Sequence, residues 1–306
     1  MFDHFVWSVL VAPVLVVIAV ALLAHRLSPS AGVSFLTWSA VAASLSGVIN
    51  LAVFTAKAAA EIPVVADHFG WSHETVIRDT AHVRWVPWLS AVLLALALVS
   101  MVLVWRRHRR AHRVALMFAD LPSDQEVVFV ENEAVDAFAV PGGRGRIIIT
   151  TAMRDSLTGD ELAVLIAHER VHLTAKHSRL ILLAELASAA HPALYWVSAR
   201  VSQLIERAAD EQAALTIGDR RTVAKAIGTA ALASSGPPLV ASSPMSFARR
   251  SRPGVIPARV AGLLAPRLPE HTKWLGLIPA TLAATSVLWT FEAIYDLHEL
   301  LTLASR

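Results

Sequence analysis

Two histidines and a glutamate stand in an H-E-x-x-H pattern near the middle of the sequence, at His168, Glu169 and His172. Apolar residues precede the pattern, and no Pro or Gly interrupts residues 161–177, which predicts a buried helix. Because positions four apart lie on one face of a helix, the two imidazoles can bind one metal ion. Glu169 lies one step round the helix, close to the metal but free to transfer protons, as in zinc-dependent hydrolases.

A third metal ligand must come from another element, because a catalytic zinc ion usually has three protein ligands and one position for water. Glu206 and Asp210 are again four residues apart, in the sequence LIERAADE. We predict Glu206 as the third ligand, and Asp210 as the acceptor that holds a ligand histidine by its other ring N–H. The H-E-x-x-H pattern alone also fits a solvated helix face. The second acidic helix favours a site for one Zn²⁺ per chain.

The composition is typical of a membrane protein. The chain has 306 residues, of which 55% are hydrophobic and 17% charged, whereas soluble domains carry about 25% charged residues. There is no cysteine, so disulfides and thiolate ligands are excluded. The isoelectric point of 9.7 is basic, but the basic residues cluster beside apolar segments. This distribution favours contact with the lipid bilayer over direct contact with nucleic acid.

Four apolar segments are long enough to predict transmembrane helices, since a span needs roughly 20 residues. The first could be a signal peptide, but it is long, lacks a basic start and shows no clear cleavage site, which favours a retained helix. In the second, we expect Asn50 to bond a neighbouring helix and Lys57 to extend toward the interface. The segments are residues 5–23, 35–60, 85–105 and 274–291.

A basic cluster at residues 106–113 follows the third span and predicts the topology. The positive-inside rule places this cluster in the cytoplasm, so the polar loop at 61–84, the N-terminus and the short tail after the fourth span lie outside. The predicted organisation is a three-span region (1–113), a cytoplasmic domain (114–273) and a fourth span with its tail (274–306). The protein would be a multi-pass component of the inner (plasma) membrane.

The cytoplasmic domain has a mixed pattern of strands and helices. Residues 126–130 predict a short strand, and residues 136–151 predict a hairpin around Pro141-Gly142-Gly143. Thr158 or Asp160 would cap the helix that carries the H-E-x-x-H pattern. The segments 178–190 and 193–211 predict helices that lie against the bilayer surface. Residues 234–252 predict a flexible loop, and the basic residues from Arg249 to Lys273, including Arg259, predict a cytoplasmic approach to the last span.

The segments AFAVPGGRGRIIITTAM, DELAVLIAHERVHLTAKH and ERAADE, after three spans, resemble the gluzincin-type integral membrane metallopeptidases. Two branches share this pattern, the BlaR/MecR-type antirepressor peptidases and the HtpX and CAAX-prenyl-protease type. HPALYWV at residues 191–197 is more similar to the first branch. The ERAAD spacing and His177 are closer to the second. The sequence ends about fifteen residues after Phe291, without the external sensor domain of BlaR receptors.

The resemblance implies zinc ligation by His168, His172 and Glu206, catalysis by Glu169 and orientation by Asp210. His177 and Tyr195 are candidates for stabilising the oxyanion or contacting the substrate, although packing or solvation also explains both. The implied fold is a mainly α membrane protein with about four transmembrane helices and an α+β gluzincin-like domain that contains a small β-hairpin sheet.

The implied activity is zinc-dependent cleavage of a cytoplasmic or membrane-adjacent protein. A BlaR/MecR-like protein would inactivate a transcriptional repressor, whereas an HtpX-like protein would remove damaged membrane proteins. A membrane scaffold stabilised by zinc is the non-enzymatic alternative. The sequence does not determine the oligomeric state.

Overall fold

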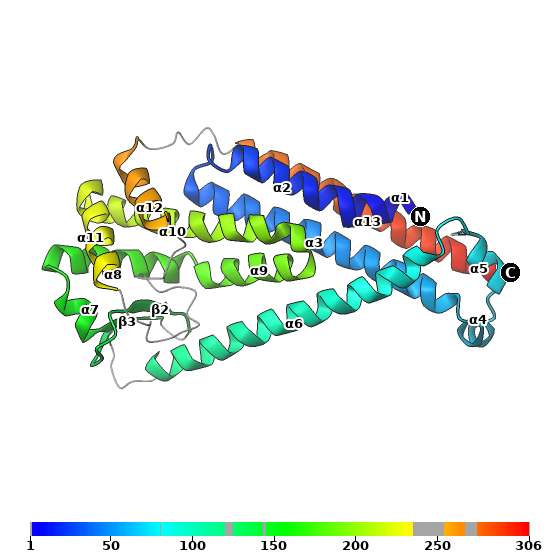
Figure 1. Cartoon of the computed structure of the whole chain (residues 1–306), viewed down its shortest axis with the longest axis horizontal. Coiled ribbons are helices and arrows are strands. Elements are labelled where there is room, and N and C mark those ends of the chain that lie inside the picture. Colours follow the sequence, from blue (N-terminus) through cyan, green and yellow to red (C-terminus); the bar gives the residue numbers. More distant parts are fainter. Residues whose placement is uncertain are drawn as a thin grey trace.

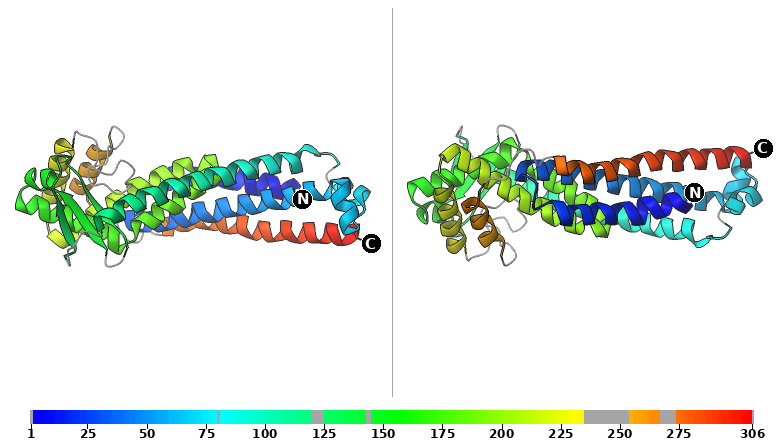
Figure 2. Two further views of the ribbon diagram at one scale, coloured as in Figure 1. Left: turned by 90° about the horizontal axis from the view of Figure 1, so that it is seen from below. Right: turned by 90° about the horizontal axis from the view of Figure 1, so that it is seen from above.

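The computed structural model describes residues 2–79, 81–119, 125–142, 145–234, 254–266 and 274–305. These residues form an elongated molecule, with a helical bundle at one end and a small sheet surrounded by shorter helices at the other (Figures 1 and 2). The chain order is α1 (Phe2–Phe5), a π-helix (Val6–Val11), α2 (Ala12–Leu23), α3 (Pro29–Ala60), α4 (Pro63–Phe69), α5 (His73–Asp79), α6 (Trp85–Ala119), β1 (Val127–Val130), β2 (Ala137–Val140), β3 (Arg146–Thr150), α7 (Thr151–Asp155), α8 (Gly159–Thr174), α9 (His177–Ala190), a 3₁₀-helix (Pro192–Leu194), α10 (Tyr195–Ile217), α11 (Arg220–Ala233), α12 (Val255–Leu264) and α13 (Leu277–Ala304).

Four helical segments among the described residues are long and apolar enough to cross a membrane, as the sequence predicts. Their exposed side chains include many large apolar residues, such as Leu22, Trp38, Leu103 and Phe291, which suit a lipid environment. The segments are Phe2–Leu23, Pro29–Ala60, Trp85–Met117 and Trp274–Ala304.

Two polar residues of α3 are buried inside the bundle. Asn50 donates to Thr290 Oγ1 of α13 at 2.9 Å, which confirms the predicted bond to a neighbouring helix. Lys57 is fully buried, where it bonds Glu61 Oε1 at 2.9 Å and the Val76 carbonyl of α5 at 3.1 Å. The prediction that Lys57 extends to the interface is therefore wrong. Its charge is neutralised within the fold by Glu61, one helical turn away.

Two segments outside the bundle centre have more helix than the sequence predicts. Residues 61–84 contain the short helices α4 and α5 instead of a continuous polar loop. The segment after Phe291 continues as α13 to Ala304, so it is a helical extension of the fourth span. The predicted loop at 234–252 lies almost entirely outside the described residues, as does part of the hairpin turn, at residues 143–144.

The pair α9 and α10 runs alongside the bundle and does not lie flat across its end (Figure 1). Ile181 and Ala184 of α9, with Val197 and Val201 of α10, belong to the same buried cluster as residues of α2 and α3. The prediction of surface helices is therefore wrong. The predicted domain boundary at residue 113 also lies inside α6, which continues to Ala119.

A hydrogen bond to the first span fixes the tip of this helix pair. Pro13 has no N–H, so it cannot donate to the Val9 carbonyl, as an α-helical residue four positions later would, or to the Ser8 carbonyl in the π-helical pattern of this segment. His191, between α9 and the 3₁₀-helix, donates from Nε2 to the Val9 carbonyl at 2.8 Å. The proline in the first span and the histidine of the helix pair thus form one complementary contact in an apolar environment.

We expect His191→Leu to lower the free energy of unfolding by about 1 kcal/mol, because it leaves a buried carbonyl unpaired. Pro13→Ala restores an N–H to the first span, so His191→Leu should cost less when combined with it. Thermal unfolding of the wild type, the two single variants and the double variant in one detergent gives the coupling free energy between Pro13 and His191. Additive effects of the two substitutions would show that the contact does not carry this energy.

The sheet has the strand order β1-β3-β2. Strand β2 pairs antiparallel with β3, with Phe138 opposite Ile148, which confirms the predicted hairpin. Strand β1, at the segment predicted from residues 126–130, pairs parallel with β3. Residues on the two faces of the sheet belong to two buried clusters, one shared with α8 and α11 and one with α6. The sheet therefore links the end of α6 to helix α8.

Candidate metal centre

Helix α8 is positioned by a capping box at its first turn. The Thr158 side chain accepts from the Glu161 N–H, and Glu161 Oε2 accepts from the Thr158 N–H at 3.0 Å. Glu161 Oε1 also accepts from Thr229 of α11 at 3.0 Å. Thr158 is therefore the cap, one of the two predicted candidates. The capping residues fix where α8 starts and tie it to α11, which sets the orientation of the H-E-x-x-H face.

This cap makes the stability of the protein depend on pH. The Thr158 N–H lowers the pKa of Glu161 below its ordinary value, against the opposing effect of burial. The ionised carboxylate therefore contributes stability above pH 4.5, and this contribution is lost as the pH falls through the lowered pKa. We expect Glu161→Gln to reduce stability by about 1 kcal/mol at pH 7 and by less at pH 4. If the stability difference between Glu161→Gln and the wild type were the same at both pH values, the ionised carboxylate of Glu161 would not be the stabilising group.

The predicted metal ligands converge on one point. His168 Nε2 and His172 Nε2 are 3.0 Å apart, because the two rings project from the same face of α8. Glu206 of α10 approaches both, with Oε2 3.7 Å from His168 Nε2 and Oε1 3.9 Å from His172 Nε2. Both histidines are almost fully buried, and Glu206 is the more open member at 13% side-chain exposure.

This donor set fits a metal ion. Ligand atoms about 2.0–2.2 Å from a tetrahedral Zn²⁺ lie roughly 3.3–3.5 Å from one another, close to the separations observed here. Two imidazoles and one carboxylate leave one tetrahedral position for water or substrate, as in catalytic zinc sites. The three residues therefore form a candidate metal site among the described residues.

Glu169 follows His168 in α8 and is fully buried. Neither of its carboxylate oxygens has a well-formed hydrogen bond with the described residues. Burial raises its pKa well above the ordinary value, partly opposed by the charge of His168. A buried carboxylate that lacks partners and holds protons more tightly than usual is suited to act as a general base.

Asp210 lies one turn after Glu206 on α10, with Oδ1 3.0 Å from His168 Nδ1. The role predicted for Asp210, holding the second ring nitrogen of a ligand histidine, requires this position. Burial opposes protonation of His168, but Asp210 and Glu206 raise its pKa to about 9. Metal binding through Nε2 would therefore have to displace a proton from His168.

Arg259 of α12 is a site residue that the sequence analysis missed. Its guanidinium bonds both carboxylate oxygens of Asp210, at 2.8 and 2.6 Å, and lies 3.2 Å from Glu206 Oε2. It is 3% exposed, so beyond its place in the predicted basic approach to the last span it belongs to the buried site. Arg259 was recognisable as the single charged residue of the otherwise apolar segment VIPARVAGLL, since a buried arginine requires an acidic partner.

The structure separates the two candidates for an oxyanion or substrate contact. His177 is buried at the start of α9, with Nδ1 3.0 Å from His172 Nδ1. Lys176, in the left-handed conformation at φ 52°, makes the turn that returns His177 to this position. Burial lowers the pKa of His177 to about 4. A neutral His177 can accept the N–H of His172, which leaves His172 Nε2 for a metal.

Tyr195 is 48% exposed at the first residue of α10. It precedes Glu206 by eleven residues, which corresponds to roughly 16 Å along the helix. The structure therefore does not bring Tyr195 to the metal site, and its predicted oxyanion role is not supported by its position.

Comparison with known proteins agrees with this geometry. Residues 105–236 match the model of peptidase family M48. The matched segment begins inside the third candidate span, Trp85–Met117, and ends after α11, so it contains His168, Glu169, His172, Glu206 and Asp210 but not Arg259. No curated protein and no solved structure matches the chain. The match and the candidate spans support a membrane metallopeptidase.

Proposed function

We propose that this protein is a zinc-dependent endopeptidase of the plasma membrane that cleaves a cytoplasmic or membrane-adjacent protein. The observation that carries the proposal is the convergence of His168, His172 and Glu206 beside the buried carboxylate of Glu169, whose oxygens accept no well-formed hydrogen bond from the described residues. The match to a peptidase family supports proteolysis over a zinc site that only stabilises a scaffold.

In the proposed reaction, His168, His172 and Glu206 hold the ion, and Asp210 and His177 fix the two imidazoles from behind. Bound zinc would supply Lewis acidity toward the scissile carbonyl and toward a water molecule. Glu169 removes a proton from the attacking water and then delivers it to the leaving amine.

Strand β2 offers the backbone groups to position an extended substrate. The Thr150 N–H donates to the Asp136 carbonyl at 3.1 Å, which fixes the alternation of the β2–β3 ladder. Ala137 and Ala139 therefore direct their N–H and C=O groups away from β3, toward the edge of the sheet. Ala139 is also the strand residue whose N–H affects the pKa of Glu169. A peptide paired with this edge would place a backbone carbonyl beside the metal site.

The basic residues at 106–113 support a cytoplasmic position for the site, because they occupy the last part of the third candidate span, Trp85–Met117, where the segment that matches the peptidase family begins. For the biological role, we propose regulated proteolysis, in which cleavage inactivates a transcriptional repressor, as in the BlaR/MecR-type peptidases that the sequence resembles. Removal of damaged membrane proteins is the second candidate. It is favoured by His177, a feature of the HtpX-type pattern, which here contacts His172.

Metal analysis and a cleavage assay on the full chain in lipid nanodiscs test the activity. We expect about one zinc ion per chain, loss of protein cleavage after chelation, and recovery on adding zinc back. Protein that binds zinc stoichiometrically but cleaves none of a broad set of unfolded proteins would favour the scaffold. Proteomics of cells carrying the active or inactive enzyme would then distinguish a repressor from damaged membrane proteins as the substrate.

A further inference from the structure

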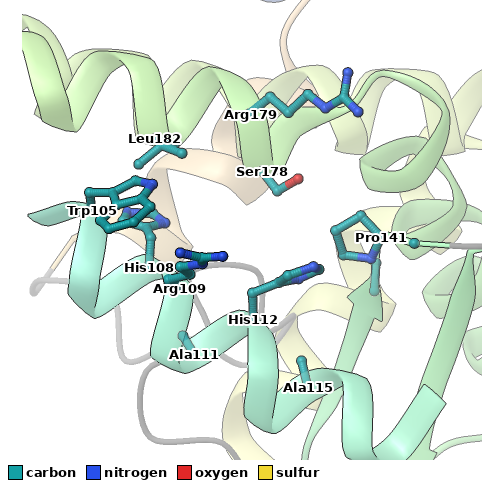
Figure 3. A pocket seen from close by; sticks show the side chains of 12 residues that line it. Trp105, His108, Arg109, Ala111, His112, Ala115, Pro141, Ser178, Arg179 and Leu182 are labelled. Carbon is teal, nitrogen blue, oxygen red and sulfur yellow. The ribbon is translucent and has the colours of Figure 1, made fainter. Parts of the chain in front are cut away.

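A pocket of about 350 Å³ lies between α6, α9 and the end of β2. Figure 3 shows Ser178 and Leu182 of α9 facing His112 and Arg109 of α6 across the pocket, with Pro141 at one end, whereas the Arg179 side chain extends along α9 with its guanidinium directed away from α6. Ala111, Ala115 and Leu182 contribute an apolar lining. None of the three metal ligands lines this pocket, but Ala139, next to Glu169, does.

The pocket has unbalanced positive charge. Arg109 and Arg179 line it, and Glu185, the acidic residue that contacts His108 of the lining, pairs with Arg107 and His108 among the described residues. Arg109 instead lies over the Trp105 ring at 4.8 Å. A third basic residue, His108, differs because its Nε2 contacts Glu185 Oε2 at 2.7 Å. The part of the chain that the structure describes thus leaves two guanidinium groups at the pocket available for an anion.

The pocket also continues the edge of β2. Ala139 directs its backbone groups away from β3, and it lines the pocket together with Pro141 and Gly142. Pro141, at the end of the pocket, is two residues beyond Ala139. Because paired strands advance by the same distance per residue, about 3.3 Å, a peptide paired with β2 reaches the end of the pocket roughly two residues from the position opposite Ala139. A peptide that pairs with β2 beside Glu169 would therefore extend between α6 and α9.

We propose that this pocket is a substrate subsite that binds an acidic side chain of the peptide, about two residues from the scissile bond. The proposal rests on the endopeptidase function above and specifies its substrate class. Arg109 would pair with the substrate carboxylate, Arg179 would add positive charge at the pocket, and the alanines and Leu182 would contact the methylene groups of the substrate side chain. A lysine at the same substrate position would meet two like charges without a counterion.

Two measurements on the full chain in neutral phosphatidylcholine nanodiscs test the subsite. The first compares kcat/KM for quenched fluorescent peptides with Glu, Gln or Lys placed two or three residues to either side of one cleavage site. The second measures binding of the same peptides to Glu169→Gln protein, which does not depend on turnover. We expect a preference of about tenfold for Glu over Gln at one position, in both measurements.

Charge reversal identifies the residues involved. Arg109→Glu combined with Arg179→Glu should invert the preference, so that the Lys peptide is favoured over the Glu peptide. Arg110→Glu is the matched control, because Arg110 is adjacent to Arg109 on α6 but does not line the pocket. This control should retain the preference for Glu.

Equal binding of Glu and Gln peptides at every position would overturn the proposal, as would an acidic preference that survives both charge reversals. An anionic lipid headgroup is a second possible ligand for the pocket. Binding of the protein variants to vesicles with and without phosphatidylglycerol tests this alternative. If the reversals change only the response to this lipid and leave peptide preference intact, the pocket binds a lipid phosphate and the proposal is overturned. Acidic preference in binding without any cleavage would retain the subsite and contradict the endopeptidase function.

Discussion

Glu169→Gln is expected to retain the bound metal and to lower the rate of peptide cleavage by a factor of roughly 10²–10⁴, the contribution of a positioned general base. The amide has the size of the carboxylate but cannot accept the proton of the attacking water. Metal should remain, because the candidate ligands are His168, His172 and Glu206. Elemental analysis and single-turnover cleavage of the same preparation measure both properties.

Asp160→Asn is a matched control for this experiment. It makes the same carboxylate-to-amide change in the same helix, but Asp160 is an exposed residue of the first turn. Cleavage should therefore match that of the wild type. Undiminished cleavage by Glu169→Gln would refute the assignment of the base, whereas loss of metal from this variant would identify Glu169 as a ligand.

Local spacing was sufficient to predict the centre of the site. The four-residue spacing of His168 and His172 requires only that one helix forms, and the capping box at Thr158 and Glu161 fixes where that helix begins. Glu206 and Asp210 repeat the same spacing on α10, so each predicted pair needed only one correct helix. The structure then brings the two helices together at distances of 3.7–3.9 Å between Glu206 and the histidines.

The path of α9 and α10 was not predictable from the same information. Residues 178–190 are apolar but too short to span a membrane, so length alone indicated a surface helix. What decides their position is tertiary: Ile181 and Val197 pack in one cluster with α2 and α3, and His191 bonds the Val9 carbonyl. A carbonyl released by a proline in the first span has no sequence relation to a histidine 182 residues later.

Arg259 shows the same limitation for charge. A sequence gives the sign of the charge on each residue but not its partner, and the six basic residues before the fourth span predicted only a cytoplasmic approach to that span. Only the packing of α12 against α10 and α11 places one of them between Asp210 and Glu206. This buried cation has a consequence for stability that differs between the metal-free and metal-bound protein.

Arg259→Met is expected to destabilise the metal-free protein by about 3–5 kcal/mol, because it leaves two buried carboxylates without their cation. Asp210 and Glu206 are neutralised in part by Arg259 and in part by His168, and the guanidinium lowers the pKa of both acids against the effect of burial. A bound divalent ion would replace part of the lost positive charge. The same substitution should therefore cost less in the metal-bound protein, and thermal unfolding with zinc and after chelation measures the difference.

Arg220→Met separates this effect from loss of α12. Arg220 also holds α12, through the carbonyls of Gly262 and Leu263 at 2.9 and 2.6 Å, but it pairs with Glu211 and has no contact with the metal ligands. Its substitution should lower stability equally with and without metal. If Arg259→Met also cost the same in both states, the guanidinium would act only as a packing anchor for α12, and the charge balance of the site would have to come from His168 alone.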